Sequence, residues 1–183
     1  MRLCKFCQEH TQAPHGKMIN SESHKLVEAV KRQLNDVMDP ELPFLTIGEM
    51  GMLRDVYFSN GHSVIVLTPT YSGCPATDII SEDSLKAARI VDPNAEIKIS
   101  MSPAWTTDWI SDETRKKMEA NGIAPPIGQS HDRSFLTGDG KTVPCPLCKS
   151  SKTKMISAFG STACKASYTC IDCMEPFEHF KCI

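Results

Sequence analysis

Four cysteines near the C-terminal end have the clearest chemical potential. They form two C-x2-C pairs, Cys145 with Cys148 and Cys170 with Cys173, separated by 21 residues. A C-x2-C turn directs two sulfurs toward one point, and two such turns joined by a hairpin create a tetrahedral four-thiolate site. Metal binding supplies folding energy to a segment too small to hold a core alone. The spacing predicts a structural metal, with zinc favoured; a rubredoxin-like redox iron uses the same ligands and is the alternative.

The remaining cysteines give weaker indications. Nine cysteines, an odd number, in a chain expected to stay in a reducing compartment argue against a disulfide framework. Cys164 and Cys182 lie outside the two pairs, and an isolated cysteine is more often a small buried residue than a ligand. A second, labile thiol site near the pairs is the alternative. The run Cys4-x2-Cys7-x2-His10 is a further, weaker candidate for metal binding.

Cys74 stands alone in the middle of the chain, between an expected strand and an expected helix. Gly73 permits a sharp turn there, and Pro75 suits the first helical position. A thiol at a helix N-terminus has its thiolate stabilised by the helix dipole, so we expect a lowered pKa for Cys74. The alternative is a buried cysteine that packs the turn, because no histidine is recognisably paired with it. His62 lies in an expected hairpin and is interpreted as a solvated surface residue.

Three acidic residues, Asp39, Glu41 and Glu49, gather in the loop DPELPFLTIGEMG. Acidic side chains near a helix end are commonly solvated or cap backbone N–H groups, and spacing alone favours that role. Trp105 and Trp109 are four residues apart, which would place them on one helical face as core residues.

Length and composition limit the number of domains and the classes of partner that we expect. The chain has 183 residues, 40% of them hydrophobic, and a formal net charge of −2. This length suits one medium domain with a second small one. The near-neutral charge gives no electrostatic reason to expect nucleic-acid binding. No apolar run approaches the ~20 residues of a membrane helix or resembles a signal peptide. We therefore expect a cytoplasmic protein with neither nucleic acid nor membrane as a partner.

Hydrophobic periodicity and turn residues predict an α+β fold. Asn60-Gly61 is a favoured hairpin turn, since both central positions require positive φ. The expected elements are a helix from Ser21 or Ser23 that Asp39-Pro40 ends, strands at 53–58 and 63–68, a helix from 76 to about 90, a strand at 95–101 and a helix at 107–120.

The composition changes along the chain and suggests four segments. We expect a flexible tail at 1–20, a compact α+β domain at 21–124, a Pro- and Gly-rich linker at 125–142, and a β ribbon at 143–183.

Several stretches resemble known families. DPELPFLTIGEMGMLRDV followed by TPTYSGCPATDII resembles the small iron–sulfur assembly domain of SufT-like proteins. The run MSPAWTTDWISDETRKKMEANGIAPP and the tail CPLCKS…SAFGSTACKASYTCIDCMEPFEHFKCI resemble one branch, the PaaD (PaaJ) family. The implied fold is a small α/β iron–sulfur-assembly-type domain followed by a C-terminal β zinc ribbon.

The resemblance implies an accessory subunit of the ring-epoxidising phenylacetyl-CoA monooxygenase of aerobic phenylacetate catabolism. Its partners would be the diiron oxygenase and the flavin/iron–sulfur reductase, whose metal centres it would help to mature. Asp39, Glu41 and Cys74 match the assembly-domain loop and thiol, which would handle iron or a transient iron–sulfur cluster. The paired cysteines match the ribbon and its structural zinc, and Cys164 and Cys182 match the family's extra cysteines. The first twenty residues lie outside the resemblance.

The sequence also lacks the motifs of the oxygenase or reductase itself. It has neither a repeated Glu-x-x-His pair, nor a G-x-G-x-x-G fingerprint, nor a C-x4-C-x2-C run. We therefore expect a subunit that is not itself catalytic. Two alternatives stay open: a structural docking subunit with a zinc staple and no metal transfer, and electron transfer through a rubredoxin-like iron. A homodimer is also left open.

Overall fold

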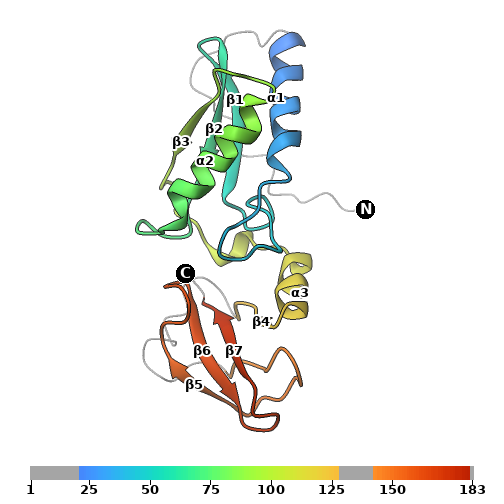
Figure 1. Cartoon of the computed structure of the whole chain (residues 1–183), viewed down its shortest axis with the longest axis vertical. Helices are drawn as coiled ribbons and strands as arrows, with labels where there is room; N and C mark the ends of the chain where they lie inside the picture. Colours follow the sequence, from blue (N-terminus) through green and yellow to red (C-terminus); the bar gives the residue numbers. More distant parts are fainter. Residues whose placement is uncertain (1–20, 128–141, 182–183) are drawn as a thin grey trace.

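The computed structural model describes residues 21–127 and 142–181. It stacks two regions along the long axis of the molecule (Figure 1). One region contains helices α1 (Ser21–Leu34) and α2 (Ala76–Arg89) with strands β1 to β3, and the other contains strands β4 to β7. Helix α3 (Asp112–Ala120) lies between them (Figure 1). The described segments contain no helix long and apolar enough to cross a membrane.

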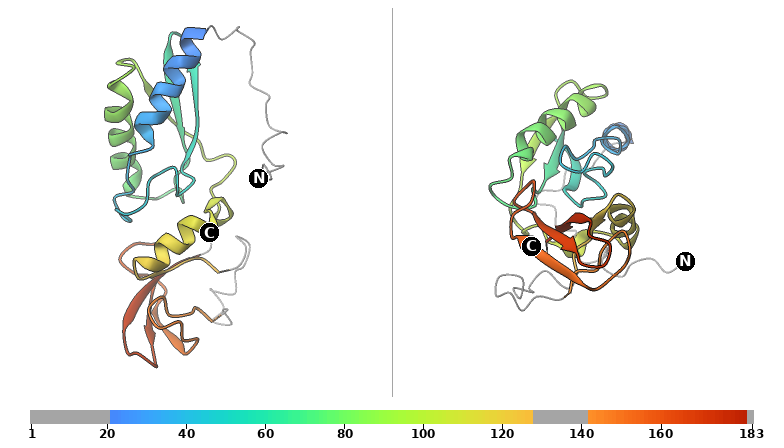
Figure 2. Two further views of the ribbon diagram at one scale, coloured as in Figure 1. Left: turned by 90° about the vertical axis from the view of Figure 1, so that its right-hand side faces the viewer. Right: turned by 60° about the horizontal axis from the view of Figure 1, so that its bottom comes forward.

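Helix α1 forms because its apolar residues recur on one face, and Val27, Val30 and Leu34 are buried along that face. The predicted helix is confirmed, but it ends at Leu34, before Pro40. Helices α1 and α2 pack on the same face of the first sheet (Figure 2, left). The first sheet is thereby covered on that face by two helices.

The first sheet has the order β1-β2-β3, formed by Leu53–Ser59, His62–Leu67 and Glu96–Ile99. Strands β1 and β2 are antiparallel and turn at Asn60-Gly61, whose φ angles are 51° and 89°. This confirms the predicted hairpin. Strand β3 runs parallel to β2 and is reached through α2, as a parallel pair requires a crossover. The turn that leads from β2 into α2 carries Cys74.

The prediction of one helix over 107–120 is wrong in its first part. Thr107–Trp109 forms a single 3₁₀ turn, and Ile110 is extended, with φ −79° and ψ 122°. Helix α3 begins only at Asp112, after the Ser111 side chain accepts a hydrogen bond from the Thr114 N–H. The two tryptophans therefore do not share a helical face. Trp105 precedes the 3₁₀ turn and is buried, and its indole N–H donates to the Met50 carbonyl at 2.8 Å.

The second sheet has the order β4-β7-β6-β5, formed by Ile123–Ala124, Pro176–Phe180, Lys165–Cys170 and Thr153–Ser157. Strands β5, β6 and β7 are antiparallel neighbours, while the short β4 pairs with β7 in parallel. The residues just after α3 therefore belong to this sheet. A small core of its own includes Tyr168 stacked on Phe177, with ring centroids 5.7 Å apart.

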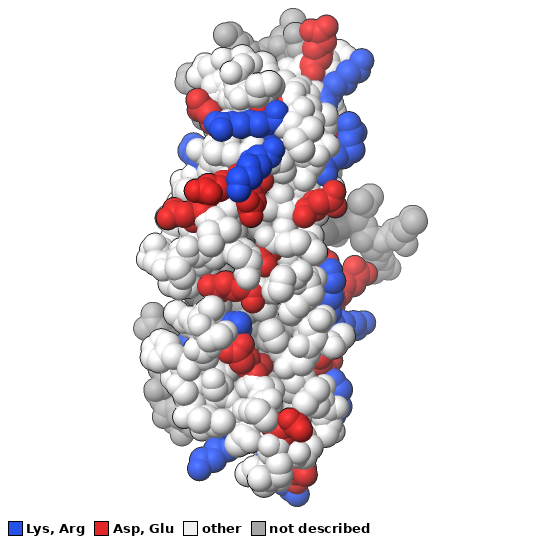
Figure 3. Space-filling model, viewed as in Figure 1, with Lys and Arg blue, Asp and Glu red and all other residues white. Residues whose placement is uncertain are grey.

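The two regions share an apolar contact. Phe180, at the end of β7, is 1% exposed and lies edge-on to Trp105, with ring centroids 6.1 Å apart. Cys164, just before β6, is also buried in the larger core of the first region. Glu119 of α3 pairs with Lys149 of the second region at 2.7 Å. Acidic and basic side chains are interspersed over the face drawn in Figure 3.

Candidate metal centre and inter-domain thiol site

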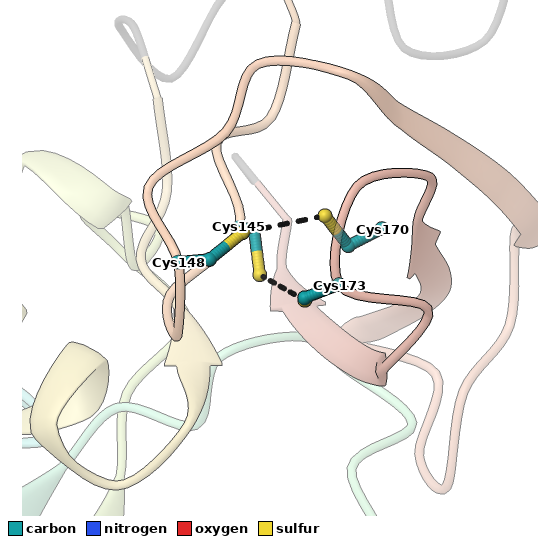
Figure 4. A group of neighbouring side chains, drawn as sticks. All are labelled: Cys145, Cys148, Cys170 and Cys173. Carbon is teal, nitrogen blue, oxygen red and sulfur yellow. Dashed lines mark hydrogen bonds between the residues drawn. The ribbon is translucent and has the colours of Figure 1, made fainter.

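The paired cysteines lie at one point, in two turns on the second sheet (Figure 4). All four sulfurs are within 4.8 Å of one another, and they could hold one metal ion. The Cys145 and Cys173 sulfurs are 3.8 Å apart, and those of Cys148 and Cys170 are 3.5 Å apart. Each C-x2-C turn thus faces the other, as a tetrahedral site requires.

The two turns are built alike. In the first turn, the Cys145 N–H donates to the Ser150 carbonyl at 2.9 Å. In the second turn, the Cys170 N–H donates to the Glu175 backbone carbonyl at 3.0 Å. In each turn the residue after the second cysteine has a positive φ, 64° at Lys149 and 62° at Met174. This shared geometry points the sulfurs inward. Backbone N–H groups, chiefly that of Cys173, lower the pKa of Cys170 to about 7, whereas burial and the neighbouring thiols raise the pKa of Cys173 to about 12.

Asp172 connects the two turns. Its carboxylate accepts a hydrogen bond from the Ser150 hydroxyl at 2.6 Å and pairs with Lys152 at 3.2 Å. The bond from Ser150 and the charge of Lys152 hold the pKa of Asp172 below its usual range. The arrangement is a closed set of four soft ligands, which suits zinc or iron.

Cys74 occupies the turn between β2 and α2, as predicted. Pro75 has helical backbone angles, φ −68° and ψ −21°, and α2 begins at the next residue. The expected lowering of the Cys74 pKa is wrong. Burial raises the pKa of this half-buried thiol, and the Ala76 N–H at the start of the helix opposes the change only in part. Without a metal, Cys74 is therefore a protonated thiol at neutral pH.

The acidic loop divides into two kinds of residue. Buried Asp39 accepts hydrogen bonds from the N–H groups of Glu41 at 2.7 Å and Leu42 at 2.9 Å, so one of its oxygens organises the turn. Burial raises the pKa of Asp39. Glu49 accepts from the Thr46 N–H at 2.8 Å and pairs with Lys117 at 3.0 Å. The predicted capping role is confirmed for Asp39 and Glu49.

Glu41 instead contacts the second region. The Cys164 thiol donates to a Glu41 carboxylate oxygen at 3.4 Å and lies 3.0 Å from the Thr162 hydroxyl. Burial, with Glu41 contributing, raises the pKa of Cys164 to about 12, although Thr162 opposes the change. The negative charge of Glu41 also raises the pKa of Cys74. The structure therefore brings Cys164 of the second region against Glu41 of the acidic loop.

The remaining residues considered in the sequence do not belong to the four-cysteine cluster or the acidic loop. His62 is not a freely solvated surface residue: its side chain is 17% exposed, and its Nε2 lies 3.2 Å from a Glu96 carboxylate oxygen. Cys4, Cys7, His10 and Cys182 lie outside the described residues.

Comparisons with known proteins agree with this two-part architecture. The model of the PaaD zinc beta ribbon domain matches residues 129–181, and a model described as an iron-sulfur cluster assembly protein matches residues 27–101. A relative from Escherichia coli (strain K12), named as a putative 1,2-phenylacetyl-CoA epoxidase subunit, is 43% identical over 152 residues, which cover 82% of this chain and 89% of the relative. The chain belongs to the PaaD family.

Two further similar proteins each match about half of this chain. A "Fe-S protein maturation auxiliary factor" of Porphyromonas gingivalis (strain ATCC BAA-308 / W83) is 31% identical, covering 52% of this chain and 92% of the relative. A crystal structure of a domain of unknown function, DUF59, from Bacillus anthracis has a TM-score of 0.46 and 26% identity, covering 51% of this chain and 91% of that one. In this PaaD chain, Asp39, Glu41 and Cys74 fall within the range of the assembly model, and Cys164 within that of the ribbon model.

One feature of the site could not be found from sequence. Cys164 and Glu41 are 123 positions apart and belong to different regions of the PaaD chain. The predicted burial of Cys164 is confirmed, since it is 4% exposed in the larger core, and its sulfur faces Glu41 of the acidic loop. The docking of the two regions brings Cys164 to Glu41.

Proposed function

We propose that this chain is an accessory subunit of a phenylacetyl-CoA ring-epoxidising monooxygenase, and that it assists the maturation of the system's iron or iron–sulfur centres. The observation that carries the proposal is the similarity to the Escherichia coli relative over both regions, at 82% of this chain and 89% of the relative. The proposed partners are the diiron oxygenase and the reductase, and the chain itself does not catalyse the epoxidation.

The ribbon cysteines are proposed to hold zinc as a structural ion. Four thiolates in a closed tetrahedral set leave no open coordination position for a substrate, as is typical of structural zinc sites. The match to the PaaD zinc beta ribbon model supports zinc over iron at Cys145, Cys148, Cys170 and Cys173. Bound zinc would stabilise the turns and keep β6 and β7 folded.

We propose that the transferred metal is handled by Cys74 together with Asp39 and Glu41 of the acidic loop. Cys74 is half-buried rather than sealed in the core, and the carboxylate of Glu41 is close enough to influence its pKa. Asp39 supports the loop that presents Glu41. The match of this region to the assembly model, and the similarity of the chain to an iron–sulfur protein maturation factor, support iron or a transient iron–sulfur cluster as the cargo.

The test is to produce the oxygenase and reductase beside the wild-type chain or a Cys74→Ser variant, without air, and to measure iron per partner chain. We expect the variant to fold normally and the iron content of at least one partner to fall severalfold. Ser72→Ala, at an exposed position of the same turn, is the matched control and should leave the partners fully loaded. Fully loaded partners beside Cys74→Ser would refute a maturation role.

A structural docking subunit is the second candidate, and one observation favours it. The two zinc-ribbon turns expose large apolar side chains at Leu147, Ile171 and Met174, each more than half exposed. Exposed apolar residues beside a rigid metal site suit a protein-binding surface. Under this candidate, Cys74→Ser would have no effect, and Leu147→Ser with Ile171→Ser would dissociate the complex while leaving the metal bound.

A further inference from the structure

We propose that Asp172 and Ser150 form a polar bridge that holds the two cysteine turns together and thereby sets how tightly the ribbon keeps its metal. This inference rests on the proposed structural zinc at the four paired cysteines and extends it. Neither residue of the bridge is a ligand, and both are positioning residues that act through the turns. A firmly held zinc lets the chain handle iron without exchanging its own structural ion.

The first step of the argument is that the bridge joins two segments far apart in the sequence. Ser150 follows the first cysteine turn, Asp172 lies within the second, and the two positions are 22 residues apart. The Ser150 hydroxyl donates to the Asp172 carboxylate at 2.6 Å. A hydrogen bond from a hydroxyl to an ionised carboxylate is short and about twice as strong as one between neutral groups. The bridge therefore restrains the separation of the two turns.

The second step is that each end of the bridge is attached to backbone that orients a cysteine. The Ser150 carbonyl accepts the Cys145 N–H at 2.9 Å, and the Ser150 hydroxyl accepts the Lys152 N–H at 3.0 Å. In the second turn, the Ile171 N–H donates to the Lys152 carbonyl at 2.8 Å, directly beside Asp172. The bridge and this backbone bond together fasten the second turn to the chain that leaves the first.

The third step is that the turns are held at the separation that a metal requires. The four sulfurs lie within 4.8 Å of one another and face each other across the two turns (Figure 4). Thiols are weak hydrogen-bond donors and acceptors, so contacts among the sulfurs contribute little to this arrangement. Ligands that are held in place lose less conformational freedom when the metal binds. Removal of residues that hold metal ligands in place typically weakens metal affinity by about 10- to 100-fold.

The bridge also carries its own countercharge. Asp172 adds a negative charge beside four cysteines that bind a metal as thiolates. The Lys152 ammonium lies 3.2 Å from the Asp172 carboxylate and offsets that charge. The two side chains are 71% and 44% exposed, and an ion pair this exposed contributes little. We therefore expect the hydrogen bond from Ser150, rather than the ion pair, to set the metal affinity.

Zinc affinity and zinc release, measured on the full chain by competition with a chromophoric chelator, test the proposal. Asp172→Ala and Ser150→Ala should each weaken zinc affinity at least about tenfold and speed zinc release. The double variant should be no weaker than Ser150→Ala alone, because both changes remove the same bond. Ser151→Ala, at an exposed position beside the bridge, is the matched control and should behave as wild type.

Conservative variants separate the bond from the charge. Asp172→Asn keeps an oxygen that can accept from Ser150, and Lys152→Met removes only the ion pair. Both should stay within about fivefold of the wild-type affinity, which is the most that an exposed ion pair contributes. Co²⁺ placed in the ribbon should show the same four-thiolate absorption in every variant, because neither residue of the bridge is a ligand.

Three outcomes would overturn the inference while the proposed ribbon zinc stands. Asp172→Ala could keep the affinity and release rate of wild type, or the effects of the two single variants could multiply in the double variant. Asp172→Asn could also prove as weak as Asp172→Ala, which would assign the effect to charge rather than to the bond. A wild-type chain that binds neither zinc nor Co²⁺ at the four cysteines would refute both the inference and the ribbon zinc.

Discussion

The two regions of the molecule reach stability by different means. Among the described residues, the larger core contains 21 buried residues, of which only Cys164 and Phe180 come from beyond α3. The smaller core contains seven, and two of them, Cys145 and Cys170, are themselves ribbon thiols. Apolar burial can hold the first region, because each large side chain removed from water contributes about 1.5–3 kcal/mol. The second region has few such residues, so we expect its stability to depend on a metal bound by the four ribbon cysteines.

Removal of the ribbon metal should have the largest effect on stability, and it should unfold the second region while the first region stays folded. Structural zinc contributes about 10–16 kcal/mol in peptides of this kind, more than a small core can replace. We expect a chelator, or Cys170→Ser, to abolish hydrogen-exchange protection in β5, β6 and most of β7 while α1, α2 and β2 stay protected. Cys74→Ser is the control, with the ribbon still protected. Continued protection of β6 in the metal-free protein would show that the ribbon core is sufficient alone.

Phe180→Ala should uncouple the regions without emptying the ribbon site. The side chain is almost fully buried at the shared contact with Trp105, and loss of a core phenylalanine costs about 3–5 kcal/mol. Thermal unfolding should separate into two transitions, with the metal content unchanged. Phe159→Ala is the matched control, because Phe159 is 68% exposed, and its removal should cost less than about 1 kcal/mol. A single unshifted transition for Phe180→Ala would place the coupling elsewhere.

Acid should weaken the ribbon through His179. Burial lowers the pKa of His179 to about 4, although its bond to the Ala124 carbonyl opposes the change. Below pH ~6.5 the unfolded chain takes up a proton that the folded chain does not, so stability falls as pH falls from about 6.5 to 4 and is level above that window. The full loss is on the order of 3 kcal/mol.

The measurement is the unfolding free energy of the ribbon between pH 7 and 5, in wild type and in His179→Gln. Protonation of the metal-binding thiolates also destabilises the ribbon in acid, but it affects both proteins equally. The difference between their pH slopes therefore isolates His179. Equal slopes would mean that His179 has the same pKa in the folded and unfolded chain.

Local signals made much of this fold predictable. The C-x2-C spacing predicted the four-cysteine cluster because two such turns can converge on one point, and Asn60-Gly61 predicted the β1–β2 hairpin because its φ angles are positive. The prediction of a helix from Thr107 was wrong because the backbone of Ile110 is extended. This conformation accompanies burial of Ile110 in the larger core, which is a tertiary contact.

The candidate site was less predictable than the fold. Helix position alone predicted a lowered pKa for Cys74, but the burial that raises it depends on the packed structure. The contact of Cys164 with Glu41 depends on how one region docks on another, and neither residue carries a local signal of that docking. Residue spacing therefore predicts the local geometry of one turn, whereas contacts between turns from different regions depend on tertiary packing.

The smallest effect is expected at the ion pair that joins the regions. Glu119 of α3 and Lys149 of the ribbon are 2.7 Å apart, but their side chains are 37% and 59% exposed. Exposed pairs contribute between zero and about 1 kcal/mol and weaken with salt. We expect Glu119→Gln to lower the unfolding free energy by less than about 1 kcal/mol, and the difference to vanish in 1 M salt. Glu119→Gln could instead separate the thermal transitions, as we expect of Phe180→Ala. In that case charge, rather than apolar burial, would hold the ribbon and its Cys164 against the first region.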